Sequence, residues 1–270
     1  MKYSNTNTYL IEGERGRLLF DTGWAGTFSA FCRAMGVLGI SVQSIDCILV
    51  SHFHPDHCGI AQQIADLGAK IAVMDVQRDY VHSADGIFMK EGNGEFKPID
   101  DTKLRYVDIT ESRAFLKELG IDGKILHTPG HSDDSISLCL DNGTLFVGDL
   151  NPMYELEAHK GTLIEDSWKA LLALKPSTIY YGHAKTYSSA GCVSDSPVSD
   201  SISAGQINGS DLHELVAKIM KYIDKGFTLD KIQKKTGADA VFIEDVTRMY
   251  LTHKDVGVQG ILDRIEIKGR

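Results

Sequence analysis

The sequence of 270 residues predicts an α/β fold followed by a smaller helical unit. Through most of the chain, short apolar runs typical of buried strands alternate with segments whose apolar residues recur at helical spacing. Several of these runs stop at a histidine or an aspartate, as expected where α/β proteins place ligands beyond the carboxyl ends of strands. After a Ser/Gly/Asp-rich stretch only helical spacing remains, which predicts a change of architecture.

These changes in pattern divide the chain into three parts. We expect an α/β catalytic domain at residues 1–187, a linker or surface loop at 188–210 and a C-terminal helical domain at 211–270. The helical domain begins with an amphipathic stretch, because its apolar residues fall on one helical face. These residues are Leu212, Leu215, Val216, Ile219, Met220 and Ile223. A short helix, a turn at Thr236-Gly237 and a further helix from about Asp239 should follow.

The first half of the α/β domain is expected to run strand, strand, helix, strand, helix, strand. The strands are expected at 7–12, 16–23, 45–52 and 70–76, and the helices at 27–40 and 58–69, where Gly68 would end the second helix. Residues 79–112 lack a clear period, so we interpret them as an inserted loop that could cover a site.

Regular elements return after this segment. A strand is expected at 123–132, a hairpin around Asp141-Asn142-Gly143, a helix at 166–175 capped by Asp166, and a last strand at 177–184. The hairpin has the strongest local signal, since Asn-Gly between two apolar runs favours a tight turn.

Composition and charge exclude several function classes. The formal net charge is −9, so the chain offers no overall basic footprint for nucleic acid. The five cysteines are odd in number and widely spaced, which does not indicate a disulfide framework. Neither a signal peptide nor an apolar run of the ~20 residues that a membrane helix needs is visible. We therefore expect a cytoplasmic protein that does not bind membranes.

The segment SHFHPDHCG, residues 51–59, carries three histidines and a carboxylate within six positions. Imidazole nitrogens bind Zn²⁺ or Fe²⁺ well, and a carboxylate can complete or bridge such a site. In an extended segment His52 and His54 point the same way and can reach one metal ion. Asp56 and His57 follow a turn set by Pro55 and can face a second point nearby.

Three further candidate ligands each end an expected strand and each follow a glycine. They are His131, Asp149 and His183. Glycine allows a sharp backbone turn that brings the next side chain close to an ion. The remaining histidines, His82, His127, His159, His213 and His253, are interpreted as turn or hydrogen-bonding residues. We expect Asp21 to pack or hydrogen-bond at a strand end, and Cys58 to be a small filler beside a ligand.

Taken together, these seven residues resemble the pattern of the metallo-β-lactamase superfamily over about residues 5–187, including the early Asp21-Thr22-Gly23. The resemblance implies a four-layer αββα sandwich. It also implies that His52, His54 and His131 hold one metal ion, that Asp56, His57 and His183 hold a second, and that Asp149 bridges them. Zinc is the expected metal, with iron or manganese as alternatives, since this ligand set suits all three.

Two divalent ions about 3.5–4 Å apart would share a hydroxide and lower the pKa of bound water to about 7. We therefore expect a hydrolase in which Asp56 orients the hydroxide and passes a proton to the leaving group. The stretch HTPGHSDDSISLCL resembles the glyoxalase II and lactonase branch, which implies a small thioester, lactone or related ester as substrate. Asp133-Asp134 departs from that branch; a solvated turn is expected there, whereas an acidic pair facing the pocket would repel anionic substrates.

Other readings remain open at the level of sequence. A persulfide dioxygenase with one iron, a phosphodiesterase and a metal-bearing regulatory protein without activity would carry similar ligands. The C-terminal unit has the order of elements expected of a helix-turn-helix. From residue 211 it holds 11 Lys and Arg against 10 Asp and Glu, and this net charge of +1 is too small to favour binding to nucleic-acid phosphates. Its apolar face is expected to pack on the catalytic domain, to form a substrate wall or to make a homodimer seam.

Overall fold

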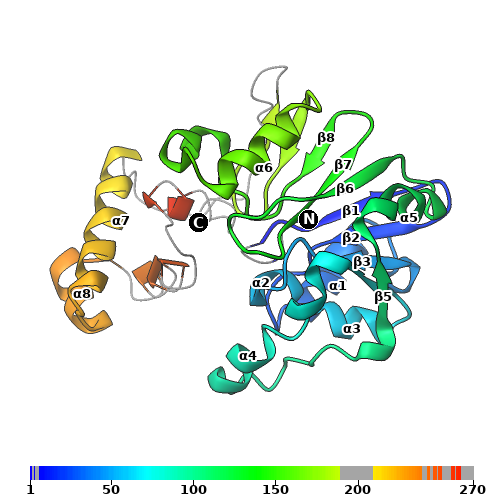
Figure 1. Ribbon diagram of the computed structural model, residues 1–270. Coiled ribbons are helices and arrows are strands. Elements are labelled where there is room, and N and C mark those ends of the chain that lie inside the picture. Colours follow the sequence, from blue (N-terminus) through cyan, green and yellow to red (C-terminus); the bar gives the residue numbers. More distant parts are fainter. Residues whose placement is uncertain are drawn as a thin grey trace. The chain divides into compact units, whose positions relative to one another are not determined.

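The structure is a computed structural model of the chain. It describes residues 1, 3, 6–188 and 209–238, and beyond these 242–243, 246–247, 249–250, 257–258 and 260–262. The chain divides into two compact units, Met1–Cys192 and Val193–Arg270, drawn in Figure 1. Most of the expected linker, residues 189–208, lies outside the described residues, so the domain boundaries stay a prediction.

The larger unit contains two five-stranded sheets. The first has the order β1-β2-β3-β4-β5, and all its neighbours pair in parallel except β1 with β2. Its strands are β1 (Tyr9–Glu12), β2 (Arg17–Phe20), β3 (Cys47–Leu49), β4 (Lys70–Met74) and β5 (Leu104–Val107). The second sheet has the order β10-β9-β8-β7-β6. Its strands are β6 (Gly123–His127), β7 (Ile136–Leu140), β8 (Thr144–Phe146), β9 (Thr178–Tyr180) and β10 (Tyr187–Ser188).

Side-chain alternation along the strands makes the two sheets the inner layers of a sandwich. In β2, Leu18 and Phe20 join a core that also contains Leu138 and Phe146 of the second sheet. Leu19 points to the other face and joins a core with Phe31 of α1 (Phe28–Val37). On the far face of the second sheet, Cys139, Leu145 and Ile179 pack with Trp168 of α6 (Leu163–Leu172). The order of layers is αββα, as expected.

Short helices connect the strands and cover the sheets (Figure 1). Besides α1 and α6, the α-helices of the larger unit are α2 (Pro55–Cys58), α3 (Ala61–Ala65), α4 (Asp85–Glu91) and α5 (Ser112–Glu118). The 3-10 helices are η1 (Val42–Ser44), η2 (Asp75–Tyr80), η3 (Asp101–Lys103), η4 (Ile109–Glu111) and η5 (Met153–His159).

Most expected strands and helices of this unit are present, but two expectations were wrong in detail. The segment 79–112 is not an irregular insertion, because it contains α4 and strand β5, which pairs in parallel with β4. The strand escaped detection because it is an edge strand with exposed polar positions and a single buried residue, Val107. Helix α6 begins at Leu163 after the N-cap Thr162, three residues before the expected cap Asp166. Helices α2 and α5 were not anticipated.

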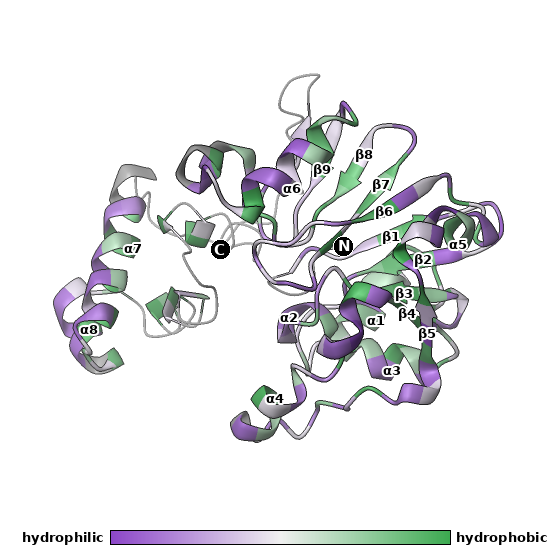
Figure 2. Ribbon diagram, in the orientation of Figure 1, coloured by the Kyte–Doolittle hydropathy of each residue, from purple (hydrophilic) through white to green (hydrophobic). Residues whose placement is uncertain are grey.

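The described residues of the smaller unit are largely helical. Its helices α7 (Gly209–Asp224) and α8 (Leu229–Thr236) alternate apolar and hydrophilic residues in Figure 2. The middle of the expected face of α7 is buried, since Val216 and Ile219 have no exposed surface and form a core with Ile232, and the rest of the face is partly buried. Gly237 ends α8 with a left-handed φ of 70°, which confirms the turn at Thr236-Gly237. The start expected for the next helix at Asp239 lies outside the described residues.

Within the described part of the chain, every helix is too short or too polar to cross a lipid bilayer.

Candidate metal centre

Four of the seven candidate ligands lie where β3 leaves the first sheet. The chain bends at Ser51 and His52 and is extended at His54, which precedes α2 with φ −75° and ψ 153°, and Pro55 occupies the first helical turn. His52 and His54 therefore lie on the segment between β3 and α2, whereas Asp56 and His57 lie on α2. The four side chains are largely withdrawn from solvent, since β3 is buried in the middle of its sheet.

The other three candidates follow strands of the second sheet. His131 lies in the loop after β6, Asp149 follows β8 and His183 follows β9. Strands β8 and β9 are parallel, and Phe146 pairs with Tyr180. Asp149 and His183 come three residues after these partners, so the register of the two strands brings their side chains to the same edge of the sheet.

The structure brings all seven candidate side chains together. Their ligand atoms form three groups of three, each with all atoms within 4.8 Å of one another. The groups are His52, His54 and His131; His52, His57 and Asp149; and Asp56, His57 and His183. The first and third groups are the two ligand sets expected from the sequence.

Asp149 lies between these two sets. Its Oδ1 is 3.2 Å from Nε2 of His57 and 3.4 Å from Nε2 of His183. Its Oδ2 is 3.6 Å from Nε2 of His131. The two oxygens of one carboxylate therefore face different histidine sets, so one ion in each set could share this carboxylate.

The donor set fits a cation. The side chain of His52 is fully buried, and its Nε2 has no hydrogen-bond partner among the described residues. A buried nitrogen without a partner is costly unless an ion compensates it. Burial also lowers the pKa of His52 and of His54, so both imidazoles are neutral near pH 7 and can offer a lone pair.

Charge in the centre is divided between histidines and carboxylates. Burial lowers the pKa of His57, but Asp149, Asp21 and Asp56 outweigh burial and raise it well above its usual value. Burial raises the pKa of Asp149, but His183, His57 and His131 outweigh it and hold this pKa well below its usual value. Without a metal ion, a proton on His57 balances the carboxylates; metal binding would displace such a proton.

Three further residues hold the ligands in place. The carboxylate of Asp21 lies 2.9 Å from Nδ1 of His57 and accepts the backbone N–H of Ser51 at 2.7 Å. The hydroxyl of Ser51 lies 3.0 Å from Nδ1 of His52. The hydroxyl of Thr6 donates to Asp56 at 3.5 Å. The sequence indicated the strand-end position of Asp21, but nothing marked Ser51 or Thr6.

Each glycine that precedes a singleton ligand is in a place where a side chain would collide. A Cβ at Gly130 would lie 2.5 Å from Ile164, and one at Gly148 would lie 2.5 Å from Oγ of Ser51. A Cβ at Gly182 would lie 2.6 Å from Oδ1 of Asp149. These glycines are needed for close packing around the centre as well as for turning the chain.

Residues considered as alternatives stay outside the ligand groups. The thiol of Cys58 donates to the carbonyl of His54, and burial raises its pKa well above the usual value, so it remains a protonated filler. Of the other histidines, His82, His127, His159 and His213 join none of the ligand groups found among the described residues, and His253 lies outside those residues. The solvated turn expected at Asp133-Asp134 is right for the exposed Asp133 and wrong for Asp134, which is 2% exposed.

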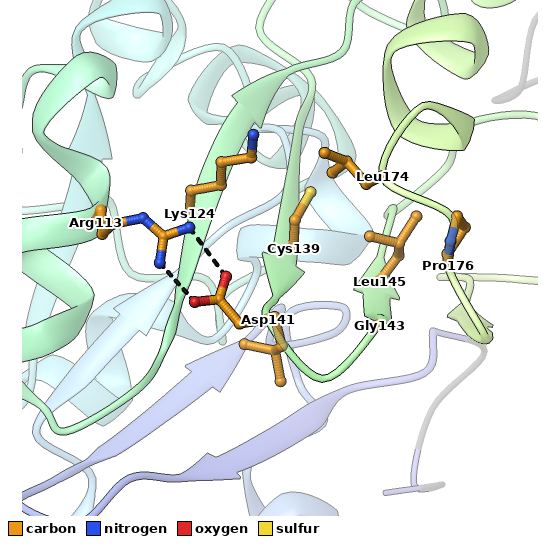
Figure 3. A pocket seen from close by; sticks show the side chains of 9 residues that line it. Arg113, Lys124, Cys139, Asp141, Gly143, Leu145, Leu174 and Pro176 are labelled. Atoms are coloured by element: carbon orange, nitrogen blue, oxygen red, sulfur yellow. Dashed lines mark hydrogen bonds and ion pairs between the residues drawn. The ribbon is translucent and has the colours of Figure 1, made fainter.

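A separate hollow of about 200 Å³ is shown in Figure 3. Arg113 on its rim makes a two-pronged ion pair with Asp141 at 2.6 and 2.9 Å. Cys139 lines it too, but burial raises the pKa of this thiol to about 12, so it is not a nucleophile. Since none of the seven candidate ligands lines this hollow, it is not part of the candidate centre.

The αββα sandwich and the histidine and aspartate cluster at the ends of its strands together place the chain in the class of proteins with a metallo-β-lactamase-like fold. The family model described as the metallo-beta-lactamase superfamily matches residues 2–183. The chain belongs to the metallo-beta-lactamase superfamily.

Curated relatives agree with this membership. The "Beta-lactamase-like protein 2 homolog" of Drosophila melanogaster is 30% identical over 189 residues, which are 68% of this chain and 60% of the relative. The "Atrochrysone carboxyl ACP thioesterase" of Aspergillus terreus is 28% identical over 150 residues, 53% of this chain and 38% of the relative. The matched parts are therefore about two-fifths to three-fifths of the length of these relatives.

Solved structures share the fold. The protein TTHA1623 in a di-iron-bound form has a TM-score of 0.53 and 24% identity, over 68% of this chain and 89% of that chain. The metallo-beta-lactamase family protein TTHA1429 from Thermus thermophilus has a TM-score of 0.52 and 17% identity, over 98% of this chain and 89% of that chain.

Proposed function

We propose that the larger unit is a hydrolase that depends on two divalent metal ions and cleaves an ester-type bond in a small molecule, with acyl thioesters as the first substrate class and lactones as the second. One observation carries the proposal: Asp149 lies between two sets of histidines, within 3.2–3.6 Å of three imidazole nitrogens. A centre for a single ion would not need a carboxylate that faces both sets.

In this proposal His52, His54 and His131 would hold one ion, Asp56, His57 and His183 would hold the other, and Asp149 would be available to both. Nitrogen and oxygen ligands suit zinc, and iron or manganese would also fit. Bound divalent ions would supply Lewis acidity and lower the pKa of a bound water to about 7.

Asp56 is the residue proposed to move the proton. Its carboxylate lies 2.9 Å from Nε2 of His183 and accepts from Thr6, so its orientation is fixed from two sides. Its side chain keeps 6% of its surface exposed, whereas that of Asp149 keeps none. A carboxylate at the accessible side of the cluster can orient an attacking water and pass its proton to a leaving thiolate or alkoxide.

Two observations support thioesters as the first substrate class. The stretch HTPGHSDDSISLCL is similar to the glyoxalase II and lactonase branch, and a relative in Aspergillus terreus carries the name of a thioesterase. An acidic pair at Asp133-Asp134 that faced the centre would repel an anionic substrate. Because Asp134 is buried, it is not one half of such an exposed pair.

Metal analysis of the purified chain with a hydrolase panel tests the proposal. We expect two ions per chain and turnover of a thioester or lactone, loss of turnover on chelation and recovery on adding Zn²⁺. One iron per chain with oxygen consumption would instead indicate a sulfur oxygenase. Turnover of phosphodiesters alone would indicate a phosphodiesterase, and bound metal without turnover on any panel member would favour a regulatory protein.

Replacing one ligand gives a sharper test. His54→Ala removes a ligand of the three-histidine set, so we expect metal content to fall and turnover to be abolished while the circular dichroism spectrum stays that of the parent. His213→Ala, an exposed histidine on α7, is the matched control and should keep both metal content and turnover. Full activity in His54→Ala would contradict the assignment of the site.

A further inference from the structure

Two buried polar side chains beside the centre have no part in the chemistry proposed above. They are Asp134, which is 2% exposed, and Gln77 of η2, which is fully buried. Buried polar groups are kept where their hydrogen bonds hold something in place, because an unsatisfied group is costly. The partners of these two side chains show what they hold.

Asp134 joins the two loops that carry the three-histidine set. Its Oδ2 accepts the backbone N–H of Phe53 at 2.7 Å. Phe53 lies between His52 and His54, and Asp134 comes three residues after His131. One short hydrogen bond to a charged acceptor therefore fixes the third histidine relative to the first two.

Gln77 secures the same junction from the first sheet. Its Nε2 donates to the carbonyl oxygens of Val50 at 3.0 Å and Asp134 at 3.2 Å, and a third carbonyl, that of Ser51, lies 3.4 Å away. Its Oε1 accepts the backbone N–H of Met74, at the end of β4. One amide thus ties the end of β4 to both histidine loops.

We propose that Asp134 and Gln77 are positioning residues for the set His52, His54 and His131. The inference rests on the proposed metal centre, because ligands must be held within roughly 0.5 Å of their productive geometry to bind an ion well. The other set has a different support, since His57 is oriented by Asp21. Loosening the Asp134 and Gln77 contacts should therefore weaken one of the two bound ions and spare the other.

Zinc titration against a chromophoric chelator tests this asymmetry in Asp134→Ala. We expect one ion to bind about 10–100-fold more weakly, the usual effect of removing a group that orients a ligand, and the other to change little. Imidazole ¹⁵N chemical shifts identify which histidines lose the ion. Asp134→Asn keeps an oxygen that can accept from Phe53 and should bind both ions nearly as the parent does.

Asp133→Ala is the matched control, because it removes the same charge from the exposed neighbouring position. It should leave both affinities unchanged. Amide exchange in the metal-free protein gives a second measurement that does not depend on activity: the Phe53 N–H should exchange faster in Asp134→Ala and at the parent rate in Asp133→Ala. Gln77→Met, which keeps length but removes the amide, should show the same asymmetry.

The outcomes separate this inference from the proposed function. A parent protein that binds no Zn²⁺ would overturn both. A parent that binds two ions, with Asp134→Ala and Gln77→Met binding both equally well, would overturn the positioning role alone. Equal weakening of both ions, in step with a general loss of fold stability, would also overturn it, since the two side chains would then be merely structural.

Discussion

At the scale of single residues, the candidate centre depends on which ring nitrogen of each histidine carries a proton. Asp21 lies 2.9 Å from Nδ1 of His57, so the ionised carboxylate keeps the proton on that nitrogen. Nε2 faces Asp149 and Asp56, whose oxygens are 3.2 and 3.9 Å away, and its lone pair would become available once a metal ion displaces the second proton. An orienting carboxylate of this kind fixes the tautomer of a metal ligand.

Replacing Asp21 by asparagine should reverse this tautomer. The amide oxygen can still accept from Ser51, and asparagine tolerates the left-handed φ of 61° found at this position, so the fold should persist. The amide N–H₂ would donate to Nδ1 of His57 and move the ring proton to Nε2. We expect Asp21→Asn to weaken one bound Zn²⁺ by about 10–100-fold in a chelator competition. Asp133→Asn is the control, and unchanged zinc affinity in Asp21→Asn would contradict this role.

Close packing at Gly182 leads to a second prediction for single residues. A methyl group there would lie 2.6 Å from Oδ1 of Asp149 and 2.9 Å from Cε1 of His57, so one of these ligands must move. We expect Gly182→Ala to lower metal content and to reduce the free energy of unfolding by about 1–3 kcal/mol, measured in urea. Gly86→Ala is the control, since a Cβ at Gly86 meets no atom within 4 Å.

The candidate ligands could be proposed from the sequence because each is a ligating residue type at a position that the sequence pattern marks. Four are crowded into six residues, and three follow a glycine at the end of an apolar run. Asp134 and Gln77 could not be found in this way. Their importance comes mainly from hydrogen bonds to backbone atoms 26 to 81 residues away, and a single polar residue carries no periodic signal of such contacts.

At the scale of elements, the register of neighbouring strands brings together side chains that no single sequence motif contains. The parallel pairing of β8 with β9 places Asp149 beside His183, and the parallel pairing of β2 with β3 places Asp21 next to the histidine segment. Buried strands such as β3 were predicted because their apolar runs are continuous. Strand β5 was missed because two of its four residues are exposed, so its sequence resembles a loop.

The segment that contains α4 and β5 should show a pH-dependent stability. His82 lies 3.0 Å from Asp85 and 3.2 Å from Asp101. Partial burial lowers the pKa of His82, but the hydrogen bonds with Asp101 and Asp85 outweigh burial and raise it. A raised folded-state pKa adds stability that is fully present below the unfolded value of about 6.5 and is lost as pH rises through the folded value.

We therefore expect His82→Gln to be less stable than the parent near pH 5.5 and equally stable near pH 9, with both pH values approximate. The effect should be small, because the His82 side chain is 49% exposed and solvent screens its ion pairs. Urea unfolding at both pH values checks it. A stability difference of the same size at both would show that charge on His82 is not its cause.

At the scale of the whole molecule, the chain contains separate hydrophobic cores for its two units. The three cores of the larger unit are formed by buried residues between Leu18 and Ala184, and the core of the smaller unit by buried residues between Val216 and Ile261. The sequence predicts a division because strand-like runs end before residue 188 and helical spacing resumes near 211, and the boundaries themselves stay a prediction. It could not predict the role of the smaller unit, since an apolar helical face does not specify what it packs against.

Separate cores imply that the units can be destabilised separately. Ile219 on α7 is fully buried in the core of the smaller unit, so Ile219→Ala should cost that unit about 2–5 kcal/mol. We expect scanning calorimetry to show one transition moved to lower temperature and another unchanged, with the zinc content of the protein as in the parent. Leu138→Ala, in the core between the two sheets, should lower the temperature of the other transition and leave that of the smaller unit unchanged. A single transition that moves as a whole in both variants would mean that the two units unfold as one, and the independence argued from their cores would be wrong.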